Sequence, residues 1–279
     1  MERIRITLVQ MAVGPDRGEN LARAEEEVRR AARAGASLVV LPEMFSCPYE
    51  ADRFHELAEP LPGGPASRLC ARLARELGIH LVGGSIPERD GDRVYNTATL
   101  WTPRGELALR HRKVHLFDVD IPGGIRFTES AVLAPGDAIS VAATGIGTIG
   151  LAVCYDLRFP ELFRAMALRG AELVVLPGAF NTTTGPAHWE TLNRARAIEN
   201  TIFVASCSPA PHPRGNYPAW GHSMVVDPWG TVLAAAGRGE EAVSAELDPG
   251  RLAEVRRALP VLRQRRPDLY GDPGGGKVN

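Results

Sequence analysis

Three side chains with reactive chemistry stand where predicted β-strands end: Glu43 after SLVVLP, Lys113 after ELALRHR and Cys154 after TIGLAV. In open α/β sheets, ligands bind beyond the carboxyl ends of the strands. A cysteine thiolate attacks carbonyl carbons, and a carboxylate whose pKa is raised by burial can take up the thiol proton. These residue types therefore predict nucleophilic catalysis at one end of a sheet.

Lysine is almost absent from this chain. Among 32 Lys and Arg residues only Lys113 and Lys277 are lysines, and Lys277 lies in a Gly-rich tail. The ammonium of a lysine is a compact point charge on a flexible stem, whereas a guanidinium is a planar fork. This contrast indicates that Lys113 has a task that an arginine cannot perform.

Cys154 has a simple structural alternative, because a cysteine at the end of an apolar strand is usually a small buried hydrophobic residue. Its context favours a nucleophile. The strand runs directly into polar residues 155–158, and Pro160 then opens a predicted helix. Backbone N–H groups at such a tight junction can face a developing oxyanion. We interpret the other three cysteines as structural residues, namely Cys47, Cys70 and Cys207.

The general base has two kinds of candidate. Histidine is the common partner of a nucleophilic cysteine, and His111 and His115 flank Lys113. A carboxylate at a strand end is the alternative, since burial raises its pKa into the useful range. Glu43 is such a carboxylate, although a glutamate at this position could also cap a helix or face solvent in a loop.

The composition excludes several classes of function. The net charge of −1 gives no electrostatic footprint for nucleic acid or an anionic membrane, and no run of 18 apolar residues exists. MERIRITLVQMAV reads as a first strand rather than a signal peptide. We therefore expect no nucleic-acid or membrane partner and a cytoplasmic location.

The sequence gives little support for a cofactor site or a metal site. GIGTIG at 145–150 matches a dinucleotide fingerprint, but strand-like residues stand on both sides, so a hairpin turn is predicted instead. The four cysteines form no C-x-x-C pair, and the seven histidines form no H-E-x-x-H pair. We expect no metal, no disulfide framework and no cofactor.

Short strand-like runs alternate with helical patterns along the whole chain, which predicts an α/β fold. AGASLVVLPE at 34–43 and RGAELVVLPG at 169–178 nearly coincide and indicate an internal repeat of two α/β halves. No linker separates the halves, so one domain is predicted over 1–270, followed by a flexible tail at 271–279. Residues 114–137 are predicted to form a long irregular loop, which in a compact domain is usually functional or disordered.

Three motifs together resemble a known family. LPE with Glu43, HRKVHLFD with Lys113 and LAVCYDLRFPE with Cys154 are similar to the Glu-Lys-Cys triad of the nitrilase superfamily of carbon–nitrogen hydrolases. The resemblance covers roughly residues 3–270. Further segments are similar to the ω-amidase branch, namely HLFDVDIPGGIRFTES, PGAFNTTTGPAHWE, PAWGHS, VVDPWG and RRPDLY.

The resemblance implies a fold and a set of roles. The fold is a four-layer α-β-β-α sandwich of two pseudo-repeated halves that dimerises, or forms a higher homo-oligomer, across the helix at 160–169. By resemblance, Glu43 is the general base, Cys154 the nucleophile, and Lys113, with the backbone N–H of Tyr155, the oxyanion stabiliser. Glu129 is implied to position the site; its structural alternative is a charged loop residue.

The resemblance also implies a substrate class, a short 2-oxo-dicarboxylic monoamide. Arg158 would anchor the acid end through a bidentate contact. Its structural alternative is an ion pair with Asp156 or Glu161. The implied pocket residues are Phe180, which could instead be core packing, Thr184 and Tyr49. Tyr49 lies in SCPYE, where ω-amidases tend to have Asn-Ser-Pro-Tyr, so the rim of the pocket is expected to differ.

Other functions remain open at this stage. Within the superfamily, the alternatives are an amidase for deaminated glutathione and another aliphatic amide or N-carbamoyl hydrolase; Gly178, Asn181 and Trp220 favour the ω-amidase. A non-catalytic module of the same fold would be expected to lack one of Glu43, Lys113 and Cys154, and all three are present. A thiol protease would require a His/Asn partnership with the nucleophile.

Overall fold

The chain folds into two halves that repeat one another in the order of their elements. The computed structural model describes residues 1–213 and 215–271. The first half contains β1 (Ile4–Gln10), α1 (Arg17–Arg33), β2 (Leu38–Val40), α3 (Pro65–Leu77), β3 (His80–Asp90), β4 (Arg93–Trp101) and β5 (Leu107–Arg112). The second contains β8 (Val141–Thr144), β9 (Gly147–Leu151), α4 (Pro160–Leu168), β10 (Leu173–Pro177), α5 (Gly185–Asn200), β11 (Phe203–Cys207), β12 (Met224–Val226) and β13 (Val232–Ala235).

Each half builds a six-stranded sheet of the same topology. The orders are β14-β1-β2-β3-β4-β5, in which β14 is Glu241–Leu247, and β13-β12-β11-β10-β9-β8. Strands β1 to β3 are parallel, as are β9 to β11, and the other neighbours are antiparallel. Strand β14 (Glu241–Leu247) comes late in the chain. It pairs with β1 at the edge of the first sheet, as β8 pairs with β9 at the edge of the second. The predicted repeat is confirmed, because its two segments become β2 and β10.

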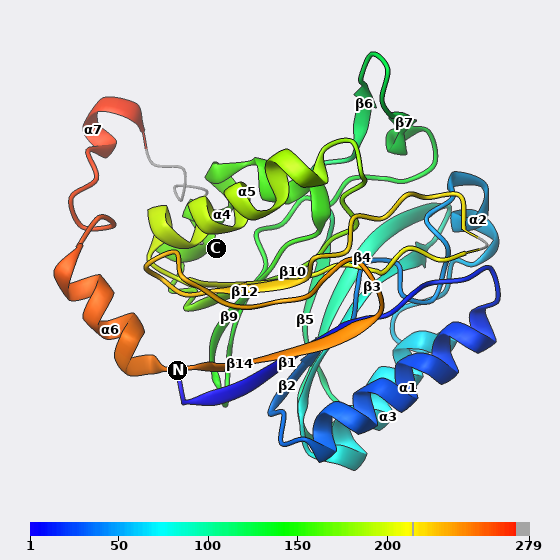
Figure 1. The fold of residues 1–279 in the computed structure, drawn as a ribbon, viewed down its shortest axis with the longest axis horizontal. Coiled ribbons are helices and arrows are strands. Elements are labelled where there is room, and N and C mark those ends of the chain that lie inside the picture. Colours follow the sequence, from blue (N-terminus) through cyan, green and yellow to red (C-terminus); the bar gives the residue numbers. More distant parts are fainter. Residues whose placement is uncertain (214, 272–279) are drawn as a thin grey trace.

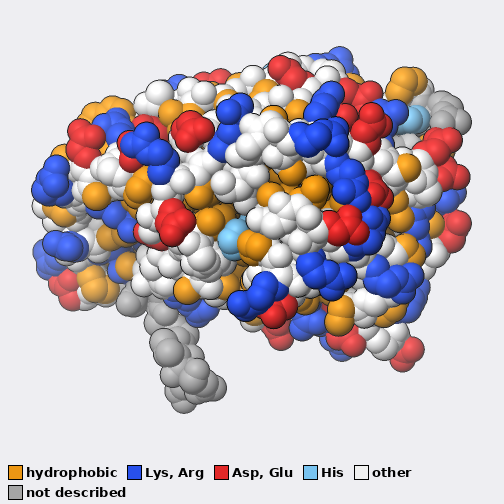
Figure 2. Space-filling model, turned by 90° about the horizontal axis from the view of Figure 1, so that it is seen from below, with side chains coloured by type: hydrophobic (Ala, Val, Ile, Leu, Met, Phe, Trp, Pro, Cys, Tyr) orange, Lys and Arg blue, Asp and Glu red, His pale blue; other side chains and the backbone are white. Residues whose placement is uncertain are grey.

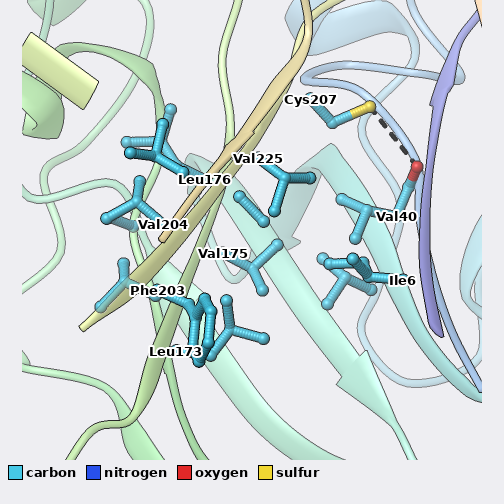
Figure 3. Close-up of a cluster of buried hydrophobic side chains, with 14 of the residues drawn as sticks. Ile6, Val40, Leu173, Val175, Leu176, Phe203, Val204, Cys207 and Val225 are labelled. Carbon is cyan, nitrogen blue, oxygen red and sulfur yellow. Dashed lines mark hydrogen bonds between the residues drawn. The ribbon is translucent and has the colours of Figure 1, made fainter. Parts of the chain in front are cut away.

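The two sheets face one another, and helices cover their outer faces. Figure 1 shows α1 and α3 against one sheet and α4 and α5 against the other, which is the predicted four-layer order. In Figure 3, Ile6 and Val40 of the first sheet meet Val175 and Val225 of the second, and the Cys207 thiol lies 3.4 Å from the Val40 carbonyl oxygen. This apolar layer between the sheets drives their association.

The helix boundaries follow from local sequence. The Asp16 side chain caps α1 by accepting a hydrogen bond of 2.9 Å from the Glu19 N–H. Pro65 opens α3, and Gly78 ends it in the left-handed conformation with φ of 65°. The buried side of α1 carries Ala24 and Val28 at helical spacing.

The loop at 114–137 has more structure than the irregular segment that the sequence predicts. It contains a hairpin of β6 (Asp118–Asp120) and β7 (Arg126–Thr128), which stands out from the body in Figure 1, and the 3₁₀ turn η1 (Glu129–Ala131). The strands are short, and a Pro-Gly-Gly turn with φ of 70° at Gly123 joins them. GIGTIG forms the predicted turn between β8 and β9.

Short elements complete the chain. They are α2 (Ala51–Glu56) beside the first sheet and, after β14, α6 (Pro249–Ala258) and α7 (Pro267–Tyr270). The predicted tail at 271–279 lies outside the described residues except for Gly271. Figure 2 shows basic and acidic side chains interspersed over one face of the molecule. On the outer side of α1 and α3, Glu25 and Glu76 both pair with Arg29 and Arg72.

Candidate active site

The structure brings Glu43, Lys113 and Cys154 together at the carboxyl ends of the facing sheets. Glu43 follows β2, Lys113 follows β5, and Cys154 opens the 3₁₀ turn η2 (Cys154–Arg158) shortly after β9. Their exposed fractions are 1%, 0% and 5%. The site is therefore almost dry, which strengthens every electrostatic interaction within it.

Glu43 is held at both carboxylate oxygens. Oε1 accepts hydrogen bonds from Asn96 Nδ2 at 2.7 Å and Lys113 Nζ at 3.4 Å, and Oε2 accepts one from the Ala179 N–H at 2.6 Å. The carboxylate also contacts the thiol of Cys154. Burial raises the pKa of Glu43, and the Lys113 ammonium only partly opposes that rise. A carboxylate in this setting is suited to take up a proton.

Lys113 lies between two carboxylates. Its Nζ is 3.4 Å from Glu43 Oε1 and 2.8 Å from Glu129 Oε2. Burial by itself lowers the pKa of Lys113, but Glu129 and Glu43 outweigh it and the pKa lies well above the usual value. The side chain therefore remains a buried cation at neutral pH.

Glu129 and Tyr49 hold this ammonium in place. Glu129 is fully buried, and its Oε2 also accepts a hydrogen bond of 2.6 Å from the Phe117 N–H. The Tyr49 hydroxyl lies 3.2 Å from Glu129 Oε1 and 3.3 Å from Lys113 Nζ. Tyr49 thus contacts the lysine and its carboxylate partner with its hydroxyl, while its ring packs against Tyr217.

Cys154 sits on a strained turn. Its φ is 47°, in the left-handed region that a residue with a Cβ rarely adopts. Such strain persists only where the surroundings fix the conformation, and it gathers at functional sites. Burial and the Glu43 carboxylate raise the pKa of the thiol, and Lys113 lowers it less. The thiol is therefore neutral at rest and needs a base before it can attack.

The Asp156 side chain stabilises the turn that carries Cys154. Its buried carboxylate accepts hydrogen bonds from the Val153 N–H at 2.9 Å, from His111 Nε2 at 3.0 Å and from His115 Nδ1 at 2.7 Å. These donors outweigh burial and hold the pKa of Asp156 well below its usual range. Both histidines thus bind Asp156, and neither has a hydrogen bond to Cys154 among the described residues. Of these candidate bases, only Glu43 contacts the Cys154 thiol among the described residues.

Arg158 is a half-buried cation without a carboxylate partner in the described part of the chain. It donates a hydrogen bond of 3.0 Å to His188 Nδ1, and its guanidinium lies 4.8 Å from the centre of the Phe180 ring. The Asp156 of the alternative ion pair contacts His111 and His115 instead, and among the described residues no ion pair joins Arg158 to Asp156 or Glu161. Burial lowers the pKa of Arg158.

Phe180 and Thr184 lie in the loop between β10 and α5. The Phe180 ring packs edge-on against Trp189 with centres 4.9 Å apart and presents its face to Arg158. It therefore serves both as core packing and as a wall beside the free guanidinium. Thr184 is buried and precedes the first residue of α5.

Gly178 occupies in the second half the position that Glu43 occupies in the first. A Cβ added at Gly178 would lie 2.8 Å from Leu176 Cδ2 and 3.1 Å from the Cα of Cys154. The Leu176 side chain can move away, but the approach to the Cys154 backbone is tighter than most real contacts, so a side chain here would press against the nucleophile turn.

Sequence reasoning missed three contributors. Asn96, in the middle of β4, is fully buried beside Glu43, and Ala179 contributes only its backbone. Tyr217 contacts Tyr49 with ring centres 4.7 Å apart and donates its hydroxyl to the Ala179 carbonyl oxygen. An asparagine inside the strand-like run RVYNTATLW was the one signal that could have revealed Asn96.

A buried thiol, a carboxylate and an ammonium at the facing strand ends of a two-sheet sandwich have the chemistry of a thiol-dependent hydrolase. The chain belongs to the carbon–nitrogen hydrolase family, whose model matches residues 5–257. The predicted membership of the nitrilase superfamily is thereby confirmed.

Individual relatives cover nearly the whole chain. It is 50% identical over 270 residues to omega-amidase NIT2 of Xenopus tropicalis, covering 97% of this chain and 98% of the relative. Nit3 of Saccharomyces cerevisiae, a member of branch 10 of the nitrilase superfamily, superposes with a TM-score of 0.87 at 42% identity, covering 95% of this chain and 97% of the other.

One solved relative bears on the nucleophile. A mutant of the amidase from Nesterenkonia sp. AN1 shows the result of Michael addition of acrylamide at its active-site cysteine; it is 31% identical, with a TM-score of 0.81, and the match covers 96% of this chain and 98% of that one. Among residues 1–213 and 215–271, no helix is long and apolar enough to cross a membrane.

Proposed function

We propose that this chain is an ω-amidase that hydrolyses the terminal amide of short 2-oxo-dicarboxylic monoamides, such as 2-oxoglutaramate and 2-oxosuccinamate, to the acid and ammonia. The half-buried guanidinium of Arg158, which no carboxylate neutralises among the described residues, carries the proposal. A carboxylate-bearing substrate supplies the missing partner. Similarity at 50% identity to a protein named omega-amidase supports the same activity.

The first half of the reaction makes a thioester. Glu43 takes the proton from Cys154, and the sulfur attacks the amide carbon. The oxyanion that forms on the carbonyl oxygen is stabilised by the Lys113 ammonium and by the backbone N–H of Tyr155. That N–H has no acceptor among the described residues, so it is available to the substrate. The intermediate then collapses, Glu43 returns its proton to the nitrogen, and ammonia leaves.

The second half releases the acid. Glu43 takes a proton from water, and the hydroxide attacks the thioester carbon. A second oxyanion forms at the same donors, the carbon–sulfur bond breaks, and the thiolate regains a proton from Glu43. The single carboxylate thus alternates between base and acid, and its raised pKa suits both tasks. Glu129 and Tyr49 are proposed to keep Lys113 aimed at the oxyanion.

The substrate pocket is proposed to extend from Cys154 toward Arg158. Phe180 forms one wall, and Thr184 closes the end beside α5. The assembly is proposed to be a homodimer, or a higher homo-oligomer, that forms across α4. Residues 1–270 are proposed to act as one catalytic domain, in the cytoplasm.

Ammonia release from 2-oxoglutaramate and from deaminated glutathione, measured side by side, tests this function. Cys154→Ala serves as the blank. We expect a clear preference for 2-oxoglutaramate, and we expect Arg158→Leu to raise KM for it at least 10-fold, because a charge-assisted contact is lost. A preference for the peptide would contradict the proposed substrate and leave the catalytic residues intact. Failure of the enzyme to release ammonia from either would contradict the activity itself.

A further inference from the structure

The side chain of Arg158 has contacts with three rings, and only one of them is a hydrogen bond. Its guanidinium carbon lies 4.8 Å from the centre of the Phe180 ring and 5.6 Å from the centre of the Tyr155 ring. Nη1 donates a hydrogen bond of 3.0 Å to Nδ1 of His188. This guanidinium makes no other hydrogen bond or ion pair within residues 1–213 and 215–271. The His188 imidazole is therefore the single acceptor that orients the group.

His188 lies in the first turn of α5, and its neighbour fixes the place of that turn. Trp189 is 1% exposed, and its ring packs against Phe180 with centres 4.9 Å apart. Its Nε1 also donates a hydrogen bond of 2.6 Å to the His222 carbonyl oxygen. The start of α5 is thus packed against Phe180, so the imidazole and the phenyl ring that contact Arg158 keep a fixed relation to each other.

The same helix holds the backbone next to Arg158. Arg196, two turns further along α5, is 5% exposed, and its Nε donates a hydrogen bond of 2.9 Å to the Leu157 carbonyl oxygen. The helix α5 therefore contacts this arginine at both ends, through the preceding carbonyl group and through the guanidinium. The direction of the side chain is set by one rigid element.

A histidine acceptor orients the arginine without cancelling its charge. A guanidinium N–H can only donate, so Nδ1 of His188 accepts through its lone pair and carries no proton. The ring in this contact is neutral, with its proton on Nε2. A carboxylate in the same place would form an ion pair with Arg158 and compete with any anionic ligand. The imidazole leaves the positive charge available.

The contact also leaves one binding edge of the guanidinium complete. An arginine binds a carboxylate in bidentate fashion through two parallel N–H groups. His188 takes a hydrogen of Nη1. Whichever hydrogen that is, the edge formed by Nε and Nη2 keeps both of its donors. A carboxylate can therefore bind side-on while the hydrogen bond to His188 persists.

We propose that His188 is a positioning residue for substrate recognition: it orients the Arg158 guanidinium so that Nε and Nη2 receive the carboxylate of the substrate. The inference rests on the proposed function, because it takes Arg158 as the anchor of the acid end. It goes further by assigning the residue that determines how strongly this anchor binds, and by giving the reason why that residue is a neutral acceptor.

Three substitutions of His188 separate orientation from charge. His188→Leu removes the acceptor at similar size. His188→Asn places a neutral carbonyl oxygen close to the position of Nδ1, and His188→Glu supplies a charged acceptor. The residue is exposed, so these variants should fold. Glu190→Gln is the matched control, because this exposed residue lies on the same helix and pairs with Arg194 instead of Arg158.

We expect His188→Leu to raise KM for 2-oxoglutaramate by about 3- to 10-fold and to change kcat less than about 2-fold, because the substrate must then order the arginine itself. His188→Asn should recover most of this loss. His188→Glu should raise KM by about 10-fold or more, since the substrate must displace an ion pair. Inhibition constants of the product 2-oxoglutarate, which keeps the anchored carboxylate, should rank the variants in the same order. Glu190→Gln should resemble the wild type.

A double-mutant cycle shows whether His188 acts through Arg158. In the Arg158→Leu background, His188→Leu should lower kcat/KM by less than about 2-fold, because its effect requires the guanidinium. A merely structural role of His188 would instead lower kcat/KM equally in both backgrounds. This comparison uses the same substrate throughout.

The outcomes distinguish the inference from the function on which it rests. An undiminished effect in the Arg158→Leu background, a loss of kcat at constant KM, or a His188→Leu enzyme with the KM of the wild type would overturn the inference and leave the amidase standing. If Arg158→Leu keeps the KM of the wild type, the anchor and this inference fall together, again without affecting the activity. If the wild type releases no ammonia from 2-oxoglutaramate, the proposed function itself fails.

Discussion

Replacing Lys113 with arginine keeps the buried charge and changes only its shape. Nζ sits between Glu43 and Glu129 with contacts of 3.4 and 2.8 Å, and its exposed fraction is 0%. A guanidinium is longer and planar, so it must either push the two carboxylates apart or enter the space of the reacting carbonyl. We expect Lys113→Arg to fold and to lose most of its turnover.

The magnitudes separate stability from activity. Because the charge remains, the folding cost is over-packing, about 1–3 kcal/mol. In contrast, Lys113→Met leaves two buried carboxylates without a cation. Removing one partner of a buried ion pair lowers the free energy of unfolding by about 3–5 kcal/mol. Displacing one oxyanion donor slows comparable reactions by about 10²- to 10³-fold. The arginine variant should therefore be the more stable of the two and still be slow.

The assay combines three measurements. Ammonia release gives kcat, thermal unfolding gives stability, and mass spectrometry after iodoacetamide treatment reports whether Cys154 is still accessible. A Lys113→Arg enzyme with kcat within about 3-fold of the wild type would refute the argument from shape. An arginine variant less stable than the methionine variant would refute the argument from buried charge.

Three further predictions concern the groups around the triad. Because burial raises the pKa of Glu43 and the base must be ionised, kcat/KM should fall with decreasing pH at a pH above the usual glutamate range. Asn96→Ala removes the 2.7 Å donor to that carboxylate, so the same acid limb should move up by about 1–2 pH units. Asp156→Asn removes the charge and replaces one of the two acceptor oxygens with an NH₂ donor, so either His115 or the pair of His111 and the Val153 N–H loses its acceptor. The free energy of unfolding in urea should therefore fall by about 3 kcal/mol.

The pH dependence of the free energy of unfolding tests whether the ionised Asp156 carboxylate stabilises the fold. Its depressed pKa means that the folded carboxylate stays ionised below pH 3.9, where the unfolded chain takes up the proton, so its stabilisation is present above that pH and is lost as the pH falls further. The asparagine variant should lack this part of the acid dependence. Identical acid profiles for both proteins, or an Asn96→Ala acid limb at the wild-type pH, would contradict these assignments.

The proposed catalytic triad could be predicted from the sequence because each of its residues follows a strand with a clear residue pattern. Parallel strands deliver their carboxyl ends to one edge, so Glu43, Lys113 and Cys154 had to meet once two sheets faced each other. The repeated segment LVVLP predicted two equivalent halves, each with a sheet of its own. Short connections with Gly and Pro at their ends fixed most of the helix boundaries.

The groups that orient the triad were less visible, because their partners come from distant parts of the chain. Asn96 reaches Glu43 from 53 positions away, and Asp156 gathers His111 and His115 from 45 and 41 positions away. Nothing local distinguishes a histidine that supports a turn from one that acts as a base. The hairpin at 118–128 was missed for a different reason: strands of three residues carry too little periodicity to detect.

Two copies of one folding unit yield a single reaction centre here, and Gly178 shows the reason. If the two halves descend from a duplicated ancestor, their strand ends began alike, and equivalent acids would have faced each other across the sandwich. In the second half, a methyl group at Gly178 would lie 3.1 Å from the Cα of Cys154, which is a tight contact with the nucleophile turn. One half could therefore specialise as the supplier of acid and ammonium only while the other gave up its side chain and supplied the thiol. The glycine thus preserves the asymmetry between the halves, and a side chain at that position would crowd the turn that carries Cys154 rather than add a second acid.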